Sequence, residues 1–217
     1  MVRRLSGFIF EWPVGNIERG SIDSCPCTKF LHIEEGSRWE RFEYTSRQAL
    51  NGEELYGDPG PYRYPIICRR SGPRIAILSV SRNVAEAFAN RLGREVLAIR
   101  LEKIAITVDA MVKLIVKRPT VYCICYANAR TPAFGTALRN VVFSGDDLGA
   151  IKWFKDSTEV MSFFLCGIRM SSGGSEIIRL GSDGRMSFQF GGPKILLQIE
   201  EVLHFLRIEK YLSREFF

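Results

Sequence analysis

Histidine is scarce in this chain of 217 residues, which holds only His32 and His204. General acid–base catalysis uses histidine most often, and neither residue lies in a catalytic motif, so we interpret both as packing or surface residues. The chain also lacks the glycine-rich phosphate loop and the nucleophile elbow of hydrolases. Acidic pairs such as Asp146-Asp147 are expected to begin helices or to lie on solvated faces. The sequence therefore favours a protein that is not an enzyme.

Long apolar runs are missing as well. The longest, near "VMSFFLCGI", is far shorter than the roughly 18 residues of a membrane span. The basic start "MVRRLSGFIF" has too short an apolar run for a signal peptide. With 46% apolar and 25% charged residues, the composition is that of a globular protein. We expect a cytoplasmic protein without membrane association.

Lysine is much rarer than arginine, with 8 lysines against 22 arginines and a net charge of +6. The planar guanidinium group suits phosphates and carboxylates better than the point charge of lysine does. The bias therefore favours an anionic partner, namely DNA or RNA. Ion-pair networks, as in thermophilic proteins, would give the same composition and stay open as an alternative.

The six cysteines include two Cys-x-Cys pairs, Cys25-Pro26-Cys27 and Cys123-Ile124-Cys125. Four thiolates would suit a tetrahedral zinc site, so zinc bound by Cys25, Cys27, Cys123 and Cys125 is one interpretation. Cys123 and Cys125 lie in the strand-like "TVYCICYA", where residues two apart share one face. We therefore favour small core residues and expect no cofactor.

The segment 64–93 has the clearest local pattern. "YPIICRR" and "RIAILSVS" alternate like two strands around the turn "SGP", and a helix follows from its N-cap Ser81 to its stop Gly93. The first sixty residues are rich in turn formers and predict only two strands, at 28–35 and 38–46. For the remaining chain we expect strands at 94–106, 120–127 and 159–170, a hairpin at 175–190, helices at 131–143, 146–156 and 191–213, and a helix or strand at 107–119.

The pattern of hairpin followed by helix occurs twice. A shift of the sequence by 111 residues without a gap superposes the following pairs: Ile66 and Ile177, Ile67 and Ile178, Ser71 and Ser182, Arg74 and Arg185, Leu92 and Leu203. This agreement predicts an internal duplication. We divide the chain into an irregular segment 1–62 and two hairpin–helix units, 63–130 and 131–217. Alternatively, residues 62–217 form a single domain.

"IIRLGSDGRMSFQF" followed by a helix resembles the hairpin-then-helix segment of the TATA-binding-protein fold. The resemblance implies an α+β fold with a mainly antiparallel sheet and helices on one face. It carries no site residues to this chain, because the residues that bind DNA in that family have no matched positions here.

Arginines gather in and beside the two predicted hairpins. If the hairpins share a sheet, these side chains form a basic track, and Tyr62, Tyr64 and Phe190 add stacking surfaces. Pairing with Glu86, Glu95 and Glu176 is the alternative. Arg69 and Arg70 are the sharper candidates, because the second hairpin lacks a similar pair. The candidate nucleic-acid-binding residues are Arg63, Arg69, Arg70, Arg74, Arg82, Arg179 and Arg185.

These observations predict an Arg-rich, nucleic-acid-associated binding protein, as a subunit of a larger complex or alone. A protein-interaction adaptor or immunity-type protein without nucleic-acid contact is the alternative. Two enzyme classes stay open. "ILSVSRNVAEAFANRLG" resembles the Ser-x-Ser strand and following helix of ADP-ribosyltransferases, but the other motifs of that family have no match. A nuclease would need acidic side chains that only the fold could bring together.

Overall fold

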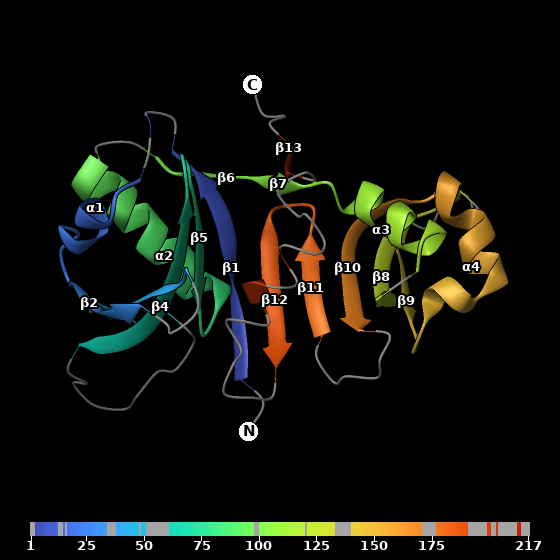
Figure 1. The fold of residues 1–217 in the computed structure, drawn as a ribbon, viewed down its shortest axis with the longest axis horizontal. Helices are drawn as coiled ribbons and strands as arrows, with labels where there is room; N and C mark the ends of the chain where they lie inside the picture. Colours follow the sequence, from blue (N-terminus) through green and yellow to red (C-terminus); the bar gives the residue numbers. More distant parts are fainter. Residues whose placement is uncertain are drawn as a thin grey trace. The chain divides into compact units, whose positions relative to one another are not determined.

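The computed structural model contains two compact units (Figure 1). The N-terminal unit comprises Arg4–Ile104 with Lys194–Glu201. The C-terminal unit comprises Ala105–Pro193 with Met1–Arg3 and Val202–Phe217. The structure describes residues 3–12, 15, 17–33, 38–47, 49–50, 61–97, 100–119, 121–132, 140–170, 177–190, 199–200, 203 and 212–213.

The N-terminal unit is built on an antiparallel sheet with the strand order β2-β3-β4-β5-β1. A short strand, β6, pairs with β1. The chain enters through β1, passes helix α1, and then runs through four successive neighbouring strands into helix α2. The bounds are β1 Arg3–Glu11, α1 Arg19–Asp23, β2 Thr28–Ile33, β3 Glu40–Ser46, β4 Tyr62–Ser71, β5 Arg74–Ser79, α2 Arg82–Leu92 and β6 Glu102–Lys103.

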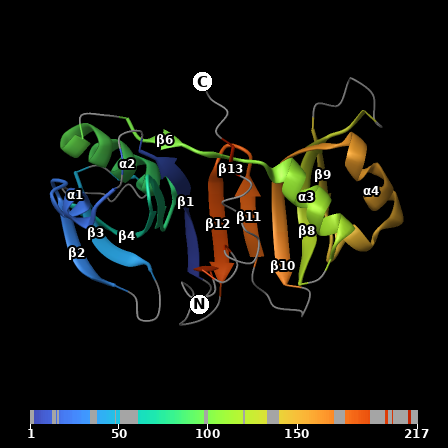
Figure 2. The same ribbon diagram turned by 45° about the horizontal axis from the view of Figure 1, so that its top comes forward.

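One face of this sheet packs against α1 and α2 (Figure 2). Alternate residues of each strand point to the same face, and those on the helix side form one apolar cluster. Phe42 and Ile66 of the sheet and Phe88 of α2 are fully buried in it. The opposite face carries the other set of strand residues, among them several of the predicted arginines.

Within the C-terminal unit the strands pair antiparallel in the order β12-β11-β10-β8-β9. Helix α3 packs against β8 and β10, and its buried side chains include Met111 and Val112. Buried residues of the strands include Ile168 and Ile178. A small separate pair joins β13 to β7. The bounds are β7 Ala105–Ile106, α3 Val108–Lys117, β8 Tyr122–Arg130, β9 Val141–Ser144, η3 Leu148–Ala150, α4 Lys152–Ser157, η4 Thr158–Val160, β10 Ser162–Met170, β11 Ile177–Gly181, β12 Arg185–Phe190 and β13 Leu212–Ser213.

The predicted α+β class with a mostly antiparallel sheet is confirmed. The strands predicted near 28–35, 38–46 and 159–170 and the two hairpins are also present. Ser81 is the N-cap of α2, because its hydroxyl accepts a hydrogen bond from the Val84 N–H at 3.4 Å. No helix in the described part of the chain is long and apolar enough to cross a membrane.

Several local predictions are wrong. Helix α2 does end at Leu92 with Gly93 as its C-cap, but Gly93 keeps a right-handed helical conformation and the chain continues as a π-helical turn, η1, over Gly93–Leu97. The strand predicted at 94–106 is therefore reduced to β6 and β7. Val141–Ser144 forms the edge strand β9 by pairing with β8, where a helix was predicted. The ambiguous segment 107–119 contains helix α3.

Two further elements differ from the predictions at the ends of the chain. Strand β1, which pairs with β5 along six residues, was not predicted at all. Within the helix predicted at 191–213, Ile199, Glu200 and Leu203 are helical, whereas Leu212–Ser213 is a strand. The rest of that segment, like 133–139 of the predicted helix 131–143, lies outside the described residues.

Candidate nucleic-acid interface

Most of the predicted arginines have carboxylate partners. On β4, Arg63 is paired with Glu43 at 3.7 Å and keeps 69% of its side chain exposed. Arg74 at the start of β5 approaches Glu11 of β1 at 3.7 Å. Arg82, at the start of α2, is exposed and has no ion pair among the described residues.

Arg69 and Arg70, the sharper pair of candidates, point to opposite faces of β4. Arg70 lies on the helix side, where it binds Glu40 at 2.6 Å beside the buried Cys68. Arg69 lies on the other face, where Nη2 and Nε donate to one oxygen of Glu200 at 2.8 and 3.0 Å. These two arginines therefore cannot act together on one ligand. Of the acidic residues named as alternative partners, Glu95 pairs with Arg91, Glu86 pairs with Lys103, and Glu176 lies outside the described residues.

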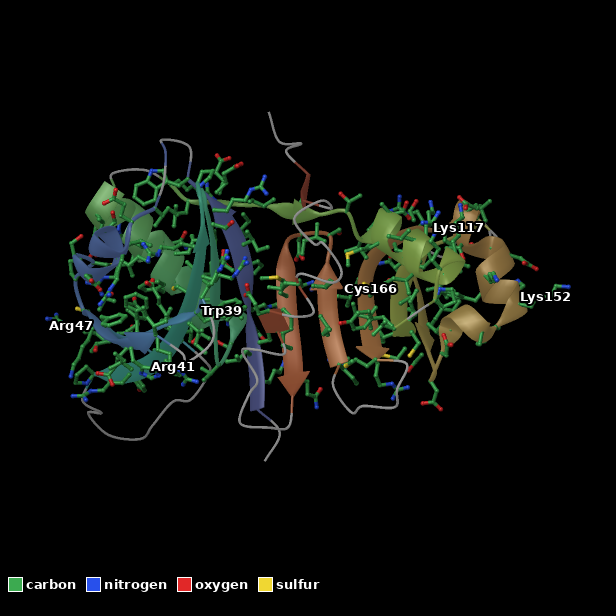
Figure 3. All side chains as sticks on the ribbon, viewed as in Figure 1. Trp39, Arg41, Arg47, Lys117, Lys152 and Cys166 are labelled. Carbon is green, nitrogen blue, oxygen red and sulfur yellow. The ribbon has the colours of Figure 1, made fainter. Side chains whose placement is uncertain are left out.

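Arg69 is the middle member of a slanted line of arginines across β3, β4 and β5. Arg41 lies opposite Ile67, two residues before Arg69, and Arg74 lies opposite Ser71, two residues after it. Such diagonal neighbours on adjacent antiparallel strands are about 7–8 Å apart. We call Arg41, Arg69 and Arg74 the N-terminal arginine diagonal. Arg41, labelled in Figure 3, is half-buried.

The same line of arginines occurs in the C-terminal unit, across β10, β11 and β12. Arg169 lies opposite Ile177, two residues before Arg179. Met186 lies opposite Leu180, so Arg185 follows opposite Gly181, two residues after Arg179. We call Arg169, Arg179 and Arg185 the C-terminal arginine diagonal. Its residues are on the sheet face that does not carry the buried row with Ile168 and Ile178.

The registers of the two hairpins differ from the ungapped shift of the sequence by 111 residues. β4 and β5 are joined by two residues, with Gly72 at φ 60°, whereas β11 and β12 are joined by three, with Gly184 at φ 80°. Because the turns differ in length, the gap-free shift by 111 superposes residues of β4 on residues of β11 that lie on the other face of the sheet. Aligning the registers gives a shift of 110 in these strands and superposes Arg69 on Arg179. In this comparison the second hairpin has an arginine at the position of Arg69, whereas Arg70 corresponds to the buried Leu180.

The central arginine differs between the diagonals in what it binds. Glu200 holds Arg69 with one carboxylate oxygen, and its other oxygen accepts a hydrogen bond from the Trp39 indole at 3.0 Å. Arg69 is accordingly only 16% exposed. Arg179 is exposed and has no ion pair within the described part of the chain. As far as the described residues go, no carboxylate is bound at the central guanidinium of the C-terminal diagonal.

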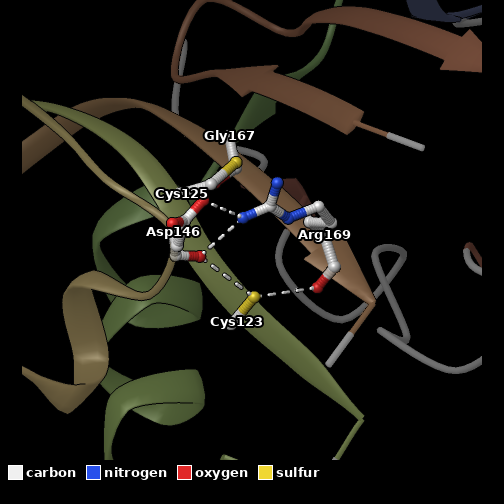
Figure 4. Close-up of polar contacts among 5 residues, drawn as sticks. All are labelled: Cys123, Cys125, Asp146, Gly167 and Arg169. Carbon is white, nitrogen blue, oxygen red and sulfur yellow. Dashed lines mark hydrogen bonds and ion pairs between the residues drawn. The ribbon is translucent and has the colours of Figure 1, made fainter. Parts of the chain in front are cut away.

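The outer members of the C-terminal diagonal are held by nearby carboxylates. Arg185 Nε lies 3.1 Å from Asp183 in the turn before β12. Gly181 makes room for this arginine, because a Cβ there would clash with the Arg185 side chain. Arg169 Nη2 donates to the Asp146 carbonyl at 2.9 Å and to its carboxylate at 3.1 Å (Figure 4). Both outer arginines therefore lie next to a solvent-exposed carboxylate.

Two thiols of strand β8 donate hydrogen bonds to backbone carbonyls at and near Arg169. Cys123 donates to the carbonyls of Asp146 and Arg169 at 3.5 and 3.6 Å, and Cys125 donates to the Gly167 carbonyl at 3.3 Å (Figure 4). Burial raises the pKa of the Cys125 thiol, and the positive charges of Arg169 and Arg179 act in the opposite direction. Both guanidinium groups therefore lie near enough to Cys125 to act on its thiol.

The structure favours core packing for the cysteines. Five of them are buried, Cys27 is exposed, and all six are free thiols. Among the residues that the structure describes, no group of three or more His, Cys, Asp or Glu side chains could hold a metal ion.

Sequence reasoning identified Arg69, Arg74, Arg179 and Arg185 but missed Arg41 and Arg169. Both missed residues lie on strands joined to the hairpins by long connections, 47–61 and 171–176, whose lengths do not determine the register. In the sequence, Arg41 and Arg169 were recognisable only as arginines within predicted strands. Comparison of the chain with protein-family models and with curated proteins gives no match.

Proposed function

We propose that this protein binds nucleic acid without catalysing a reaction, and that the C-terminal arginine diagonal contacts the phosphates. The observation that carries the proposal is the exposed Arg179 between two anchored arginines. Guanidinium groups bind phosphate through paired hydrogen bonds. The N-terminal diagonal supports this role, because its central arginine already binds an anionic group, the Glu200 carboxylate.

Neighbouring side chains suit a nucleic-acid surface. Ser187 lies directly opposite Arg179 on β12, and Gln189 lies one step farther along the same face. On the other side, Gly167 separates Arg179 from Tyr126 of β8. Hydroxyl and amide groups bind phosphates and sugars, and tyrosine provides a surface for base stacking.

Fluorescence anisotropy with labelled single- and double-stranded oligonucleotides tests this function. We expect binding that weakens steeply between 50 and 200 mM salt, because neutralised phosphates release counterions, and a log–log slope reduced by about one in Arg179→Ala. Arg94→Ala is the matched control, since this side chain is 80% exposed and lies in the turn after α2. Absence of binding to DNA and RNA at 50 mM salt would exclude the function and leave a protein-interaction adaptor.

We also propose that the two units arose by duplication of a TATA-binding-protein-like unit. Each sheet contains four neighbouring strands in a related order, β2-β3-β4-β5 and β8-β10-β11-β12, preceded by α1 and α3. The two arginine diagonals have equivalent registers, and β9 with α4 is then an insertion in the C-terminal unit. Related sequences should keep or lose the arginines at equivalent positions of both diagonals; independent variation would contradict the proposal.

A further inference from the structure

The N-terminal diagonal holds two groups at its centre, an anion and an aromatic ring. The anion is the carboxylate of Glu200, bound by Arg69. The ring is the indole of Trp39, which donates its N–H to the same carboxylate and is fully buried. Trp39 directly precedes β3, and the register that pairs Glu40 with Cys68 continues to place it opposite Arg69. The chain therefore supplies both groups itself.

The C-terminal diagonal lacks both groups among the described residues. The residue opposite Arg179 on β10 is Gly167, which corresponds to Trp39 and carries no side chain. Arg179 has no carboxylate partner there and is exposed. A Cβ at Gly167 would lie 2.9 Å from Tyr126 Cβ, so this side of the position is bordered by the tyrosine. Tyr126 is half-buried and lies in register with Gly167 on β8.

We infer that the C-terminal diagonal binds one purine nucleotide of a single-stranded nucleic acid, with the phosphate on Arg179 and the base against Tyr126. The phosphate takes the place that the Glu200 carboxylate has on Arg69, and the base takes that of the Trp39 indole. Indole and purine are both flat, fused bicyclic rings, so the correspondence favours purines over pyrimidines. The inference rests on the proposed function of the same site.

A single strand fits this site because the base must leave its neighbours to lie on the sheet. Bases in a duplex are stacked and paired, so an aromatic side chain on a flat face cannot reach their rings. Arginines at the two ends of the diagonal then lie along the backbone on either side of the bound nucleotide. Arg169 and Arg185 keep their carboxylate partners, so they bind the nucleic acid more weakly than Arg179 does and mainly orient it.

The test compares labelled oligo(A), oligo(C) and a duplex of mixed sequence, as DNA and as RNA, in 50 mM salt. We expect the wild-type protein to bind oligo(A) about tenfold more tightly than oligo(C) or the duplex, and Tyr126→Leu to remove that preference. Arg179→Ala should weaken binding to every oligonucleotide. Trp153→Ala is the control, because Trp153 of α4 is a 46% exposed aromatic residue outside the diagonal and should change nothing. Thermal unfolding of each variant verifies that it is folded.

The outcomes separate this inference from the proposed function. If no oligonucleotide binds, the proposed function is wrong. If oligonucleotides bind with equal affinity for oligo(A), oligo(C) and duplex, or if Tyr126→Leu keeps the preference, the function stands and the purine site is wrong. If Trp153→Ala removes the preference, the base lies on α4 instead. If AMP displaces oligo(A) at an equal concentration of nucleotide, the site binds a mononucleotide, and the inference that it binds a strand is wrong.

Discussion

Replacement of Glu200 by alanine tests how the N-terminal diagonal is held. Glu200 accepts hydrogen bonds from Arg69 at 2.8 and 3.0 Å and from the Trp39 indole at 3.0 Å. The side chains of Arg69 and Glu200 are 16% and 25% exposed. Glu200→Ala therefore removes a carboxylate that binds both a largely buried guanidinium and a fully buried indole N–H.

The size of the effect follows from burial. Removal of one partner from a fully buried ion pair costs about 3–5 kcal/mol, and an exposed pair is worth about 0–1 kcal/mol. For this partly exposed network we expect a loss of about 2 kcal/mol in the free energy of unfolding, a value between these limits. For a chain of this length that lowers the melting temperature by roughly 4–8 °C.

The assay is urea and thermal unfolding followed by circular dichroism and tryptophan fluorescence. Glu159→Ala is the matched control, since Glu159 pairs with Lys117 while both side chains stay more than half exposed, and we expect no measurable change. A double-mutant cycle with Arg69→Ala should return a coupling of about 1–2 kcal/mol between Arg69 and Glu200. Equal stability of Glu200→Ala and Glu159→Ala would refute the contact and, with it, the comparison between the two diagonals.

Three other outcomes are expected. Gly7→Ala should cost about 3 kcal/mol or prevent folding, because its Cβ would clash with the Ile77 carbonyl oxygen; Gly20→Ala, where a Cβ would meet no atom of another segment within 4 Å, should be neutral or stabilising in urea titrations. At pH 8 a thiol reagent should label Cys27 quickly and the other cysteines slowly, since Cys27 alone among the six is exposed and burial raises the pKa of Cys166 to about 12; six equal rates would contradict the packing. Phe88→Ala should lower the free energy of unfolding by about 3–5 kcal/mol through loss of core contacts, and a shift under 1 kcal/mol would exclude its place in the core.

Local sequence patterns predicted many of the strands and the helix α2. The alternation in "YPIICRR" and "RIAILSVS" gave the hairpin, and Ser81 with the spacing of Val84 and Phe88 gave α2. These elements depend on interactions between residues close in the chain, so a single sequence contains their signal. β1 and β9 were missed because each is a strand only through its pairing with a distant segment.

The candidate site was predicted only in part for the same reason. The turn arginines Arg74 and Arg185 were visible from their place after Gly-Pro and Asp-Gly, and Arg69 and Arg179 from strand-like runs. The error was one residue: an ungapped repeat treated turns of different length as equal, and a one-residue slip moves every strand side chain to the other face. Arg70 was therefore grouped with Arg69, although it faces Glu40 beside the core.

The sequence by itself determined the excess of arginine, the scarcity of histidine, the alternating strands and the two hairpins followed by helices. Only the tertiary structure decided which arginines share a face, because registers between β3 and β4 and between β10 and β11 depend on pairing across long connections. It also decided that Glu200, 131 residues away in the chain, holds Arg69, while Arg179 remains exposed. Charge is a property of composition, but whether a charge is available to a ligand depends on its neighbours in space.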